Sequence, residues 1–224
     1  MFNLDLVRLD SLPRKMVDGK RMYQTPDGNH YPSVTTITSQ LAKEGIVAWR
    51  KRIGEAAANK ITTQASARGT SVHKLCEDYC LNQLDEKDKK IMPSNRSMFN
   101  TIKGALDKRV NNIRSVEGFL YSHFLRTAGQ VDLIAEFDGK LSIIDFKTST
   151  KLKPEAWIQN YFIQESAYSF MFEERTGIQV PQLVTIIGVD SESEPQIFVK
   201  NARQRNEYLM QFIDLREAFD RAAA

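Results

Sequence analysis

The amino-acid sequence predicts an α/β fold in which a mixed β-sheet is flanked by helices. Two runs rich in β-branched and aromatic residues flank Asp138-Gly139, the strongest short hairpin signal, because both turn positions need φ > 0. Segments with helical periodicity alternate with further strand patterns along the chain. The expected core order is a strand at 115–122, hairpin strands at 129–137 and 140–148, a helix at 154–175, strands at 182–190 and 195–200, and a closing helix at 202–222.

The length of 224 residues suits one medium domain, or a core with an appended helical part. We expect residues 1–112 to form an N-terminal arm and a helical region, and residues 113–224 to form the core, in one compact unit. Hydrophobic residues make up 42% of the chain, which suffices for a buried core. The net charge of +3 permits a polyanionic partner but does not indicate one by itself.

Features that would indicate secretion or a membrane are missing from the sequence. No apolar run reaches the roughly 18 residues of a membrane span, and the N-terminus lacks the charged start and apolar core of a signal peptide. Cys76 and Cys80 lie four apart in a helical pattern, which favours buried thiols over a disulfide. We therefore expect a soluble, intracellular protein without a membrane partner.

The hairpin carries the candidate catalytic residues. If Asp138 and Gly139 form a two-residue loop, counting back along both strands places Asp132 opposite Asp145. Side chains alternate between the faces of a strand, so Lys147 projects on the same side as the two aspartates. The sequence thus predicts two carboxylates and an amine gathered on one face of the sheet.

Two carboxylates across a sheet lie roughly 4.5–5.5 Å apart at Cβ and destabilise it unless something offsets their repulsion. A divalent ion does so, and Mg²⁺ is typically held by one or two carboxylates together with substrate phosphates. An adjacent lysine adds a donor that could orient a water or stabilise phosphoryl charge. The alternative is an Asp–Lys–Asp cluster on a solvated surface. The apolar neighbours weigh against it; they are Ile134, Ile143, Ile144 and Phe146.

Asp132 followed by Asp145-Phe146-Lys147 resembles the PD-(D/E)XK nuclease superfamily. The surrounding strings G-x-V-D and I-D-F-K-T-S resemble its RecB-like exonuclease branch. The resemblance implies a restriction-endonuclease-like core with an N-terminal helical extension. It also implies that Asp132, Asp145 and the backbone carbonyl of Phe146 bind one or two Mg²⁺ or Mn²⁺ ions. Lys147 would then act in catalysis beside the two aspartates.

The N-terminal residues 2–31 alternate weakly, with turn signals at Asp18-Gly19 and Asp27-Gly28. They predict a short hairpin or an extended arm.

A capped helix is expected next, with Ser33 as N-cap and Val34, Ile37 and Leu41 on one face. The string P-S-V-T-x-I that begins at Pro32 also resembles the entry to the core in mitochondrial and bacteriophage members of the same branch.

A second helix is expected over 46–61, and it carries Trp49-Arg50-Lys51-Arg52. Three adjacent cations beside a tryptophan suit neutralisation of a nucleic-acid backbone combined with base stacking. A solvated face with one packed tryptophan explains the same residues. Both interpretations stay open at this point.

Gly69 and Thr70 suggest a helix start, and His73 and Glu77 share a face because they lie four apart. The string from Arg68 resembles the G-x-x-x-H signature of the same branch, which implies that His73 reaches the metal. A histidine ligand suits Mn²⁺ better than Mg²⁺. Glu77 could orient His73 as a neighbouring group or be simply solvated.

The polar stretch 82–96 predicts a loop that either borders a substrate channel or only connects two elements. A helix is expected at 97–113, and Glu117 lies near the start of the strand after it. In the superfamily, an acidic residue at such a place can join the site. An exposed charge at a strand end is the alternative for Glu117.

The helix at 154–175 places Trp157, Tyr161, Gln164 and Tyr168 on one stripe. A packed aromatic face explains this stripe without any function. The pair Gln164 and Tyr168, however, resembles the Q-x-x-x-Y motif of the branch, which implies that both flank the site and contact DNA.

Together the motifs imply a divalent-metal-dependent DNA exonuclease that prefers single-stranded DNA or strand ends. The chain resembles small stand-alone exonucleases of mitochondria and bacteriophages, and a phage origin would place it in the cytoplasm of an infected bacterium. Two cysteines exclude a four-cysteine iron–sulfur cluster. A structure-selective or flap endonuclease and a non-catalytic nucleic-acid-binding module remain as alternatives. The expected DNA contacts are Gln164, Tyr168, Arg68, Thr148, Trp49, Arg50 and Arg52.

Overall fold

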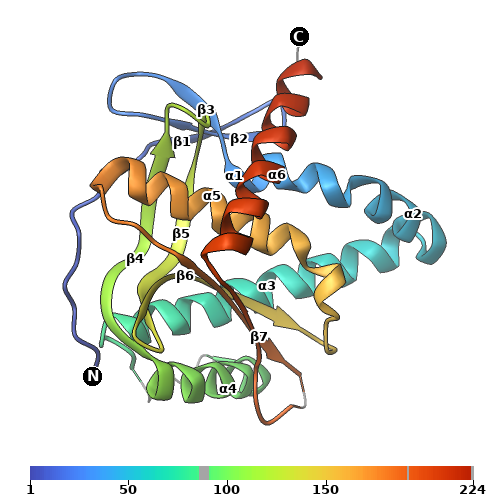
Figure 1. Cartoon of the computed structure of the whole chain (residues 1–224). Coiled ribbons are helices and arrows are strands. Elements are labelled where there is room, and N and C mark those ends of the chain that lie inside the picture. The colour runs from blue at the N-terminus through green and yellow to red at the C-terminus, as the bar shows by residue number, and fades with distance from the viewer. Residues whose placement is uncertain (86–90, 191, 223–224) are drawn as a thin grey trace.

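A five-stranded sheet lies between two helical layers in this computed structural model (Figure 1), which describes residues 1–85, 91–190 and 192–222. The strand order is β4-β5-β6-β7-β8, and only the β6–β7 pair is parallel. The predicted mixed sheet flanked by helices is confirmed. Its strands are β4 Val110–Ser122, β5 Thr127–Phe137, β6 Lys140–Ser149, β7 Gln182–Val189 and β8 Gln196–Lys200.

The hairpin between β5 and β6 forms as predicted. Asp138 and Gly139 both have positive φ, at 51° and 74°, and Phe137 pairs with Lys140 across the turn. The pairing of β5 with β6 runs back from the turn and stops at Leu133 opposite Ile144. The predicted pairing of Asp132 with Asp145 is therefore wrong as a ladder pair. Beyond this point β6 continues its ladder with β7 alone, as far as Ser149.

Helices α3 (Glu55–Cys80) and α4 (Pro93–Arg109) cover one face of the sheet (Figure 1), and α5 (Gln159–Thr176), α6 (Ala202–Arg221) and the short α1 (Val34–Thr38) cover the other. Each face buries its own apolar cluster, so the sheet has a core on both sides. Cys76 and Cys80 lie in the first cluster as buried free thiols. Burial raises the pKa of the Cys80 thiol to about 12. None of the described helices is both long and apolar enough to cross a membrane.

The N-terminal region forms a separate three-stranded antiparallel sheet of β1 (Arg14–Val17), β2 (Lys20–Gln24) and β3 (His30–Pro32). The expected hairpin at Asp18-Gly19 is present. Ser33 caps α1 as predicted, because its hydroxyl accepts a hydrogen bond from the N–H of Thr36 at 3.0 Å.

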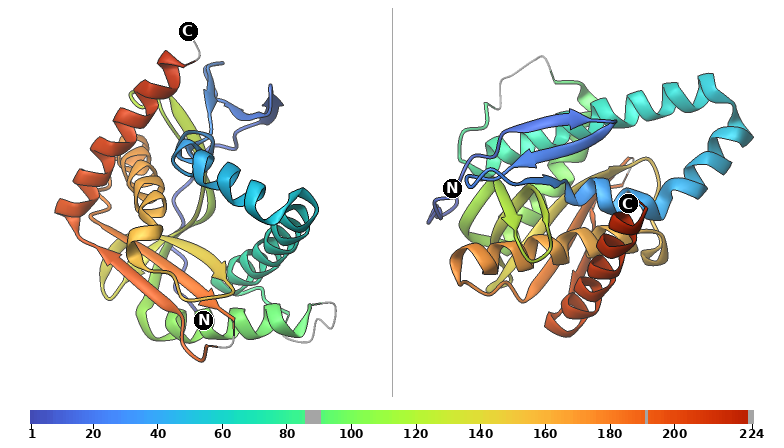
Figure 2. Two further views of the ribbon diagram at one scale, coloured as in Figure 1. Left: turned by 90° about the vertical axis from the view of Figure 1, so that its right-hand side faces the viewer. Right: turned by 90° about the horizontal axis from the view of Figure 1, so that it is seen from above.

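The helix expected over 46–61 is in fact two helices. Helix α2 (Lys43–Ile53) ends at Gly54, whose φ of +86° an L side chain would rarely adopt, and α3 begins at the next residue. Gly69 and Thr70 do not start a helix but lie inside α3. A Cβ at position 69 would meet the Thr148 hydroxyl at 4.0 Å, an ordinary van der Waals contact, so lack of space does not explain this mid-helix glycine. Together α2 and the N-terminal part of α3 form a V that projects from the body of the molecule (Figure 2).

Other predicted boundaries also shift. Leu41 is exposed because α1 ends at Thr38 and a 3₁₀ turn follows it. Helix α4 begins four residues before the expected start at position 97, and β4 before the expected position 115. Residues 86–90 of the predicted loop lie outside the described residues. Trp157 is 74% exposed because it lies in a 3₁₀ turn before α5, and so it is not part of the packed stripe.

Candidate active site

A cavity of about 550 Å³ opens where β5 and β6 separate. Helix α3 borders it on one side and α5 on the other, while β2 and the start of α1 complete the wall. It gathers most of the residues that the sequence singles out for catalysis and metal binding. Those in its lining are His73, Glu77, Glu117, Asp132, Asp145, Lys147, Gln164 and Tyr168.

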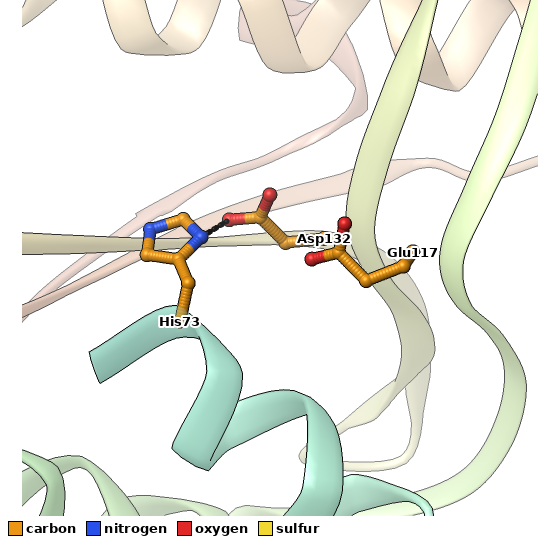
Figure 3. A group of neighbouring side chains, drawn as sticks. All are labelled: His73, Glu117 and Asp132. Carbon is orange, nitrogen blue, oxygen red and sulfur yellow. Dashed lines mark ion pairs between the residues drawn. The ribbon is translucent and has the colours of Figure 1, made fainter. Parts of the chain in front are cut away.

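Three of these residues form a compact group of potential metal ligands. One ligand atom each from His73, Glu117 and Asp132 lies within 4.8 Å of the others (Figure 3). The Nδ1 atom of His73 is 3.4 Å from Oδ2 of Asp132. The three side chains come from α3, β4 and β5, so the packing of α3 across the sheet creates the group.

Glu117 joins this group through an unusual backbone conformation. It lies in the middle of β4 with φ = +51°, which is rare for a residue with a side chain and costs roughly 1–3 kcal/mol. Burial, followed by the nearby charges of Asp132 and Glu77, raises the pKa of Glu117 to about 8. Glu117 is thus a half-buried carboxyl inside the cavity, and the predicted alternative of an exposed strand-end charge is wrong.

Asp132 also fixes the backbone of β6. Its Oδ2 accepts a hydrogen bond from the N–H of Phe146 at 2.9 Å. The ring of Phe146 meets His73 edge-on, with ring centroids 6.3 Å apart. The carboxylate therefore ties the two separating strands together at the cavity. Metal binding by the Phe146 carbonyl stays a prediction.

Asp145 is almost fully buried, with 2% of its surface exposed. Its Oδ1 accepts a hydrogen bond from Nε2 of Gln164 at 3.0 Å, and its Oδ2 forms an ion pair with Lys147. Burial raises the pKa of Asp145, the Lys147 charge opposes that shift, and the Asp132 charge adds to it. The second predicted aspartate is thus held between α5 and the predicted catalytic lysine.

Lys147 is placed by a carboxylate and an aromatic ring. Its ammonium lies 5.1 Å from the ring centroid of Tyr161, a cation–π contact, and also contacts Asp145. Burial works to lower the pKa of Lys147, but the charges of Asp145 and Asp132 outweigh it and raise the pKa. The lysine therefore remains a charged donor in the cavity.

Tyr168 is buried against Gly129, the glycine of the G-x-V-D string. A Cβ at position 129 would lie 2.7 Å from Cε1 of Tyr168, closer than such atoms approach. The glycine thus makes room for the tyrosine, and two of the sequence motifs prove to be one packing contact.

The remaining predicted residues lie around the cavity or away from it. Arg68 donates from Nε to the Thr148 hydroxyl at 3.3 Å, which links α3 to the end of β6. Glu77 accepts from Lys74 at 3.0 Å, and no contact between Glu77 and His73 is found among the described residues. The α2 residues are not in the cavity lining; they are Trp49, Arg50 and Arg52. Arg50 instead pairs with Glu55.

Sequence reasoning missed one wall of the cavity. Arg21 and Tyr23 of β2 line it, together with Ser33 and Thr35 at the start of α1. The alternation of Arg21 and Tyr23 along a strand was the available signal, since it puts both on one face. Nothing local to the sequence indicated that this face would meet the β5–β6 hairpin.

A second missed residue is Glu165, which lies on α5 next to Gln164 and is fully buried. It contacts Thr185, the residue that pairs with Asp145 across β6 and β7. Burial, with the charge of Asp145, raises the pKa of Glu165 well above its usual value. A buried carboxyl, whose charged form burial disfavours, therefore lies behind the aspartate.

The residues present suit a divalent ion. One imidazole nitrogen and two carboxylates are gathered in the His73 group, and oxygen donors of this kind are what Mg²⁺ and Mn²⁺ prefer. Burial, followed by the charges of Asp132 and Glu77, raises the pKa of Glu117, and a divalent ion bound beside these carboxylates would oppose that shift. Asp145 is not a member of this group, although it lines the same cavity.

Comparison with known proteins agrees with this geometry. The family model of the PD-(D/E)XK nuclease superfamily matches residues 49–224. The mitochondrial genome maintenance exonuclease 1 of Homo sapiens is 31% identical over 144 residues, which cover 60% of this chain and 40% of that protein. Its counterparts from Xenopus tropicalis and Mus musculus are 29% and 28% identical, over 61% and 56% of this chain and 42% and 39% of theirs. The chain thus spans about two fifths of the length of these relatives. On the family match, it belongs to the PD-(D/E)XK nuclease superfamily.

Proposed function

We propose that the chain is a divalent-metal-dependent DNA exonuclease that acts on single-stranded DNA or strand ends. The observation that carries the proposal is the cavity in which the His73–Glu117–Asp132 group lies beside the Asp145–Lys147 ion pair. A module that only binds nucleic acid gains nothing from carboxylates that repel phosphate. Membership of a nuclease superfamily and the similarity to exonucleases support the same conclusion.

The ligands in this proposal are His73, Glu117 and Asp132, with Asp145 and the Phe146 carbonyl adjoining. When bound, the ion polarises the scissile phosphate and lowers the pKa of a bound water. Lys147 holds its ammonium where it can orient that water and meet the negative charge that develops on the phosphate. Mg²⁺ and Mn²⁺ are both candidates, and the imidazole favours Mn²⁺.

The α5 residues position this machinery. Gln164 holds Asp145 by a hydrogen bond, and Tyr161 holds Lys147 through its ring. Tyr168 packs on Gly129 and so fixes the start of the strand that carries Asp132. In the proposed function, Gln164 and Tyr168 also flank the bound DNA strand.

The preference for single strands is supported by the size of the cavity. A volume of about 550 Å³ lies in the range of small-ligand sites, which suits a short length of one strand better than a duplex. We propose that Trp49, Arg50 and Arg52 on the projecting α2 contact the strand outside the cavity, by stacking and charge.

The division into residues 1–112 and 113–224 also remains a proposal.

The test is digestion of end-labelled linear single-stranded, circular single-stranded, duplex and flapped DNA, each with Mg²⁺, with Mn²⁺ and with a chelator. We expect linear single strands to be degraded from an end, circular single strands to resist, and the chelator to stop the reaction. Ready cleavage of circles or of flap junctions would favour an endonuclease on the same core. Binding without cleavage of any substrate would indicate a non-catalytic module.

A further inference from the structure

Some of the charged side chains that line the cavity form ion pairs and one cation does not. Its four carboxylates are Glu77, Glu117, Asp132 and Asp145. Two of its cations are paired: Lys74 lies 3.0 Å from both Glu77 and Asp78, and Lys147 contacts Asp145. Arg21 is different, because no carboxylate of the described chain lies within ion-pairing distance of it.

Arg21 lines the cavity from a different part of the fold than these carboxylates. They come from α3, β4, β5 and β6, whereas Arg21 and Tyr23 come from β2 of the separate small sheet. The backbone carbonyl of Arg21 accepts a hydrogen bond from the N–H of Ser33 at 2.8 Å, which ties this strand to the start of α1. The exposed guanidinium therefore extends from a hydrogen-bonded strand.

The charge of Arg21 reaches the interior of the site. Burial, followed by the charges of Asp132 and Asp145, raises the pKa of Tyr168, and the positive charge of Arg21 opposes this shift. The guanidinium is thus within electrostatic range of the tyrosine that packs beside the Asp132 strand. It is free to bind an anion because no carboxylate of the described chain holds it.

We propose that Arg21 binds a backbone phosphate of the substrate strand. In this proposal the small β1–β3 sheet holds the strand in the cavity beside the four carboxylates. The inference deepens the proposed nuclease function and rests on it. A DNA strand beside four carboxylates needs cations to bind, and a planar guanidinium matches phosphate oxygens with two parallel hydrogen bonds. Thr35 adds a hydroxyl to the same wall.

The chain offers a matched control. Lys15 on β1 pairs with Met22, the neighbour of Arg21 on β2, so its side chain projects from the opposite face of the small sheet. It is exposed and carries the same charge as Arg21. Arg21→Ala and Lys15→Ala therefore remove equal charge from one sheet, but only the first removes it from the cavity.

The experiment measures equilibrium binding of a single-stranded oligonucleotide over a series of salt concentrations, in a Lys147→Ala background that prevents cleavage. Each lost phosphate contact lowers the salt slope of log K by about 0.7 for single strands. We expect Arg21→Ala to weaken binding about tenfold or more and to lower the slope by that amount. Arg21→Lys should keep the slope, and Lys15→Ala should change neither quantity.

Equal affinities and slopes for Arg21→Ala and Lys15→Ala would overturn the inference, and so would a wild-type chain that binds no single strand. Cleavage assays in the natural chain, which keeps Lys147, separate this result from the proposed function. A raised KM with little change in kcat for Arg21→Ala supports a phosphate-binding role. If Arg21→Ala lowers the salt slope of binding but the natural chain cleaves no substrate, the nuclease proposal is refuted. The phosphate-binding role of Arg21 would still be supported.

Discussion

The molecule contains two hairpins that share one turn sequence but differ in their surroundings. Both turn at Asp-Gly: Asp18 and Gly19 have φ of 49° and 72°, and Asp138 and Gly139 have φ of 51° and 74°. The strand β1 of the first hairpin is exposed at every position. The strand β5 of the second is mostly buried and is an interior strand of the large sheet.

The difference shows that the turn residues specify a hairpin, whereas the packing around its strands decides which side chains it can hold in place. In the second hairpin the flanking apolar side chains are packed on both faces, so the strands are held while Asp132 and Asp145 occupy positions that repel each other. Burial there also raises the pKa of Asp145. The first hairpin instead carries Arg21, which pairs with no carboxylate of the described residues. In our proposals, the second hairpin carries residues that act in catalysis, and the first carries Arg21, which contacts the substrate.

The largest expected effect tests the chemical role of the second hairpin. Lys147→Ala should lower the cleavage rate by roughly 10²–10³-fold, because a half-buried charged donor to the developing phosphate charge is lost. Lys140→Ala is the control, since Lys140 is exposed at the other end of the same strand. Single-turnover cleavage of a labelled strand measures both. Similar rates for the two variants would remove Lys147 from the mechanism.

Metal binding should stabilise the same hairpin. At a Mn²⁺ concentration of about 100 times Kd, the free energy of unfolding should rise by about 2.7 kcal/mol, since the ion binds only the folded site. Asp132→Asn should abolish this gain because it removes a ligand that also anchors Phe146. Urea unfolding with and without Mn²⁺ measures the difference. An equal gain in the variant would place the ion elsewhere.

The two turns can be compared directly by adding one methyl group to each. Gly139→Ala and Gly19→Ala impose the same left-handed strain of about 1–2 kcal/mol, because neither site has a neighbour within 4 Å of the new Cβ. Gly139→Ala should lower the global free energy of unfolding by this amount. Gly19→Ala should lower it less, because β1 is exposed at every position and can separate from β2 locally. Urea unfolding and amide hydrogen exchange distinguish the cases. Equal global losses would show that the first hairpin is part of the cooperative core.

The smallest effect concerns the ring that holds Lys147. Tyr161→Leu removes a cation–π contact of about 0.5–1 kcal/mol, so kcat should fall roughly two- to fivefold. Tyr161→Phe keeps the ring and should restore most of the rate. The comparison of kcat and KM for the two variants is the measurement. If Tyr161→Phe lowered kcat as much as Tyr161→Leu, the hydroxyl of Tyr161 rather than its ring would support Lys147.

The parts of the fold that were predictable from the sequence are those specified by neighbours along the chain. The turn at Asp138-Gly139, the cap at Ser33 and the closing helix α6 each depend on a few adjacent residues. The break at Gly54 was missed because a single glycine within a helical pattern is also tolerated inside helices, as Gly69 is.

The candidate site was predictable where motifs resemble a family, and not where separate elements meet. The distance between His73 and Asp132 depends on how α3 packs across the sheet, which no local pattern reveals. The positive φ of Glu117 could not be inferred either, because a glutamate in a strand normally has negative φ. Arg21 was missed for the same reason: it lines a cavity together with residues such as Asp132 and Asp145, which are far from it in the sequence.

The most direct test of the central claim is release of labelled nucleotides from a linear single strand, with Mg²⁺ or Mn²⁺, by the natural chain and by Asp145→Asn. The account predicts metal-dependent release by the natural chain and loss of that activity in the variant, whose far-ultraviolet circular dichroism should be unchanged. Undiminished release by Asp145→Asn, or release that continues in a chelator, would contradict it.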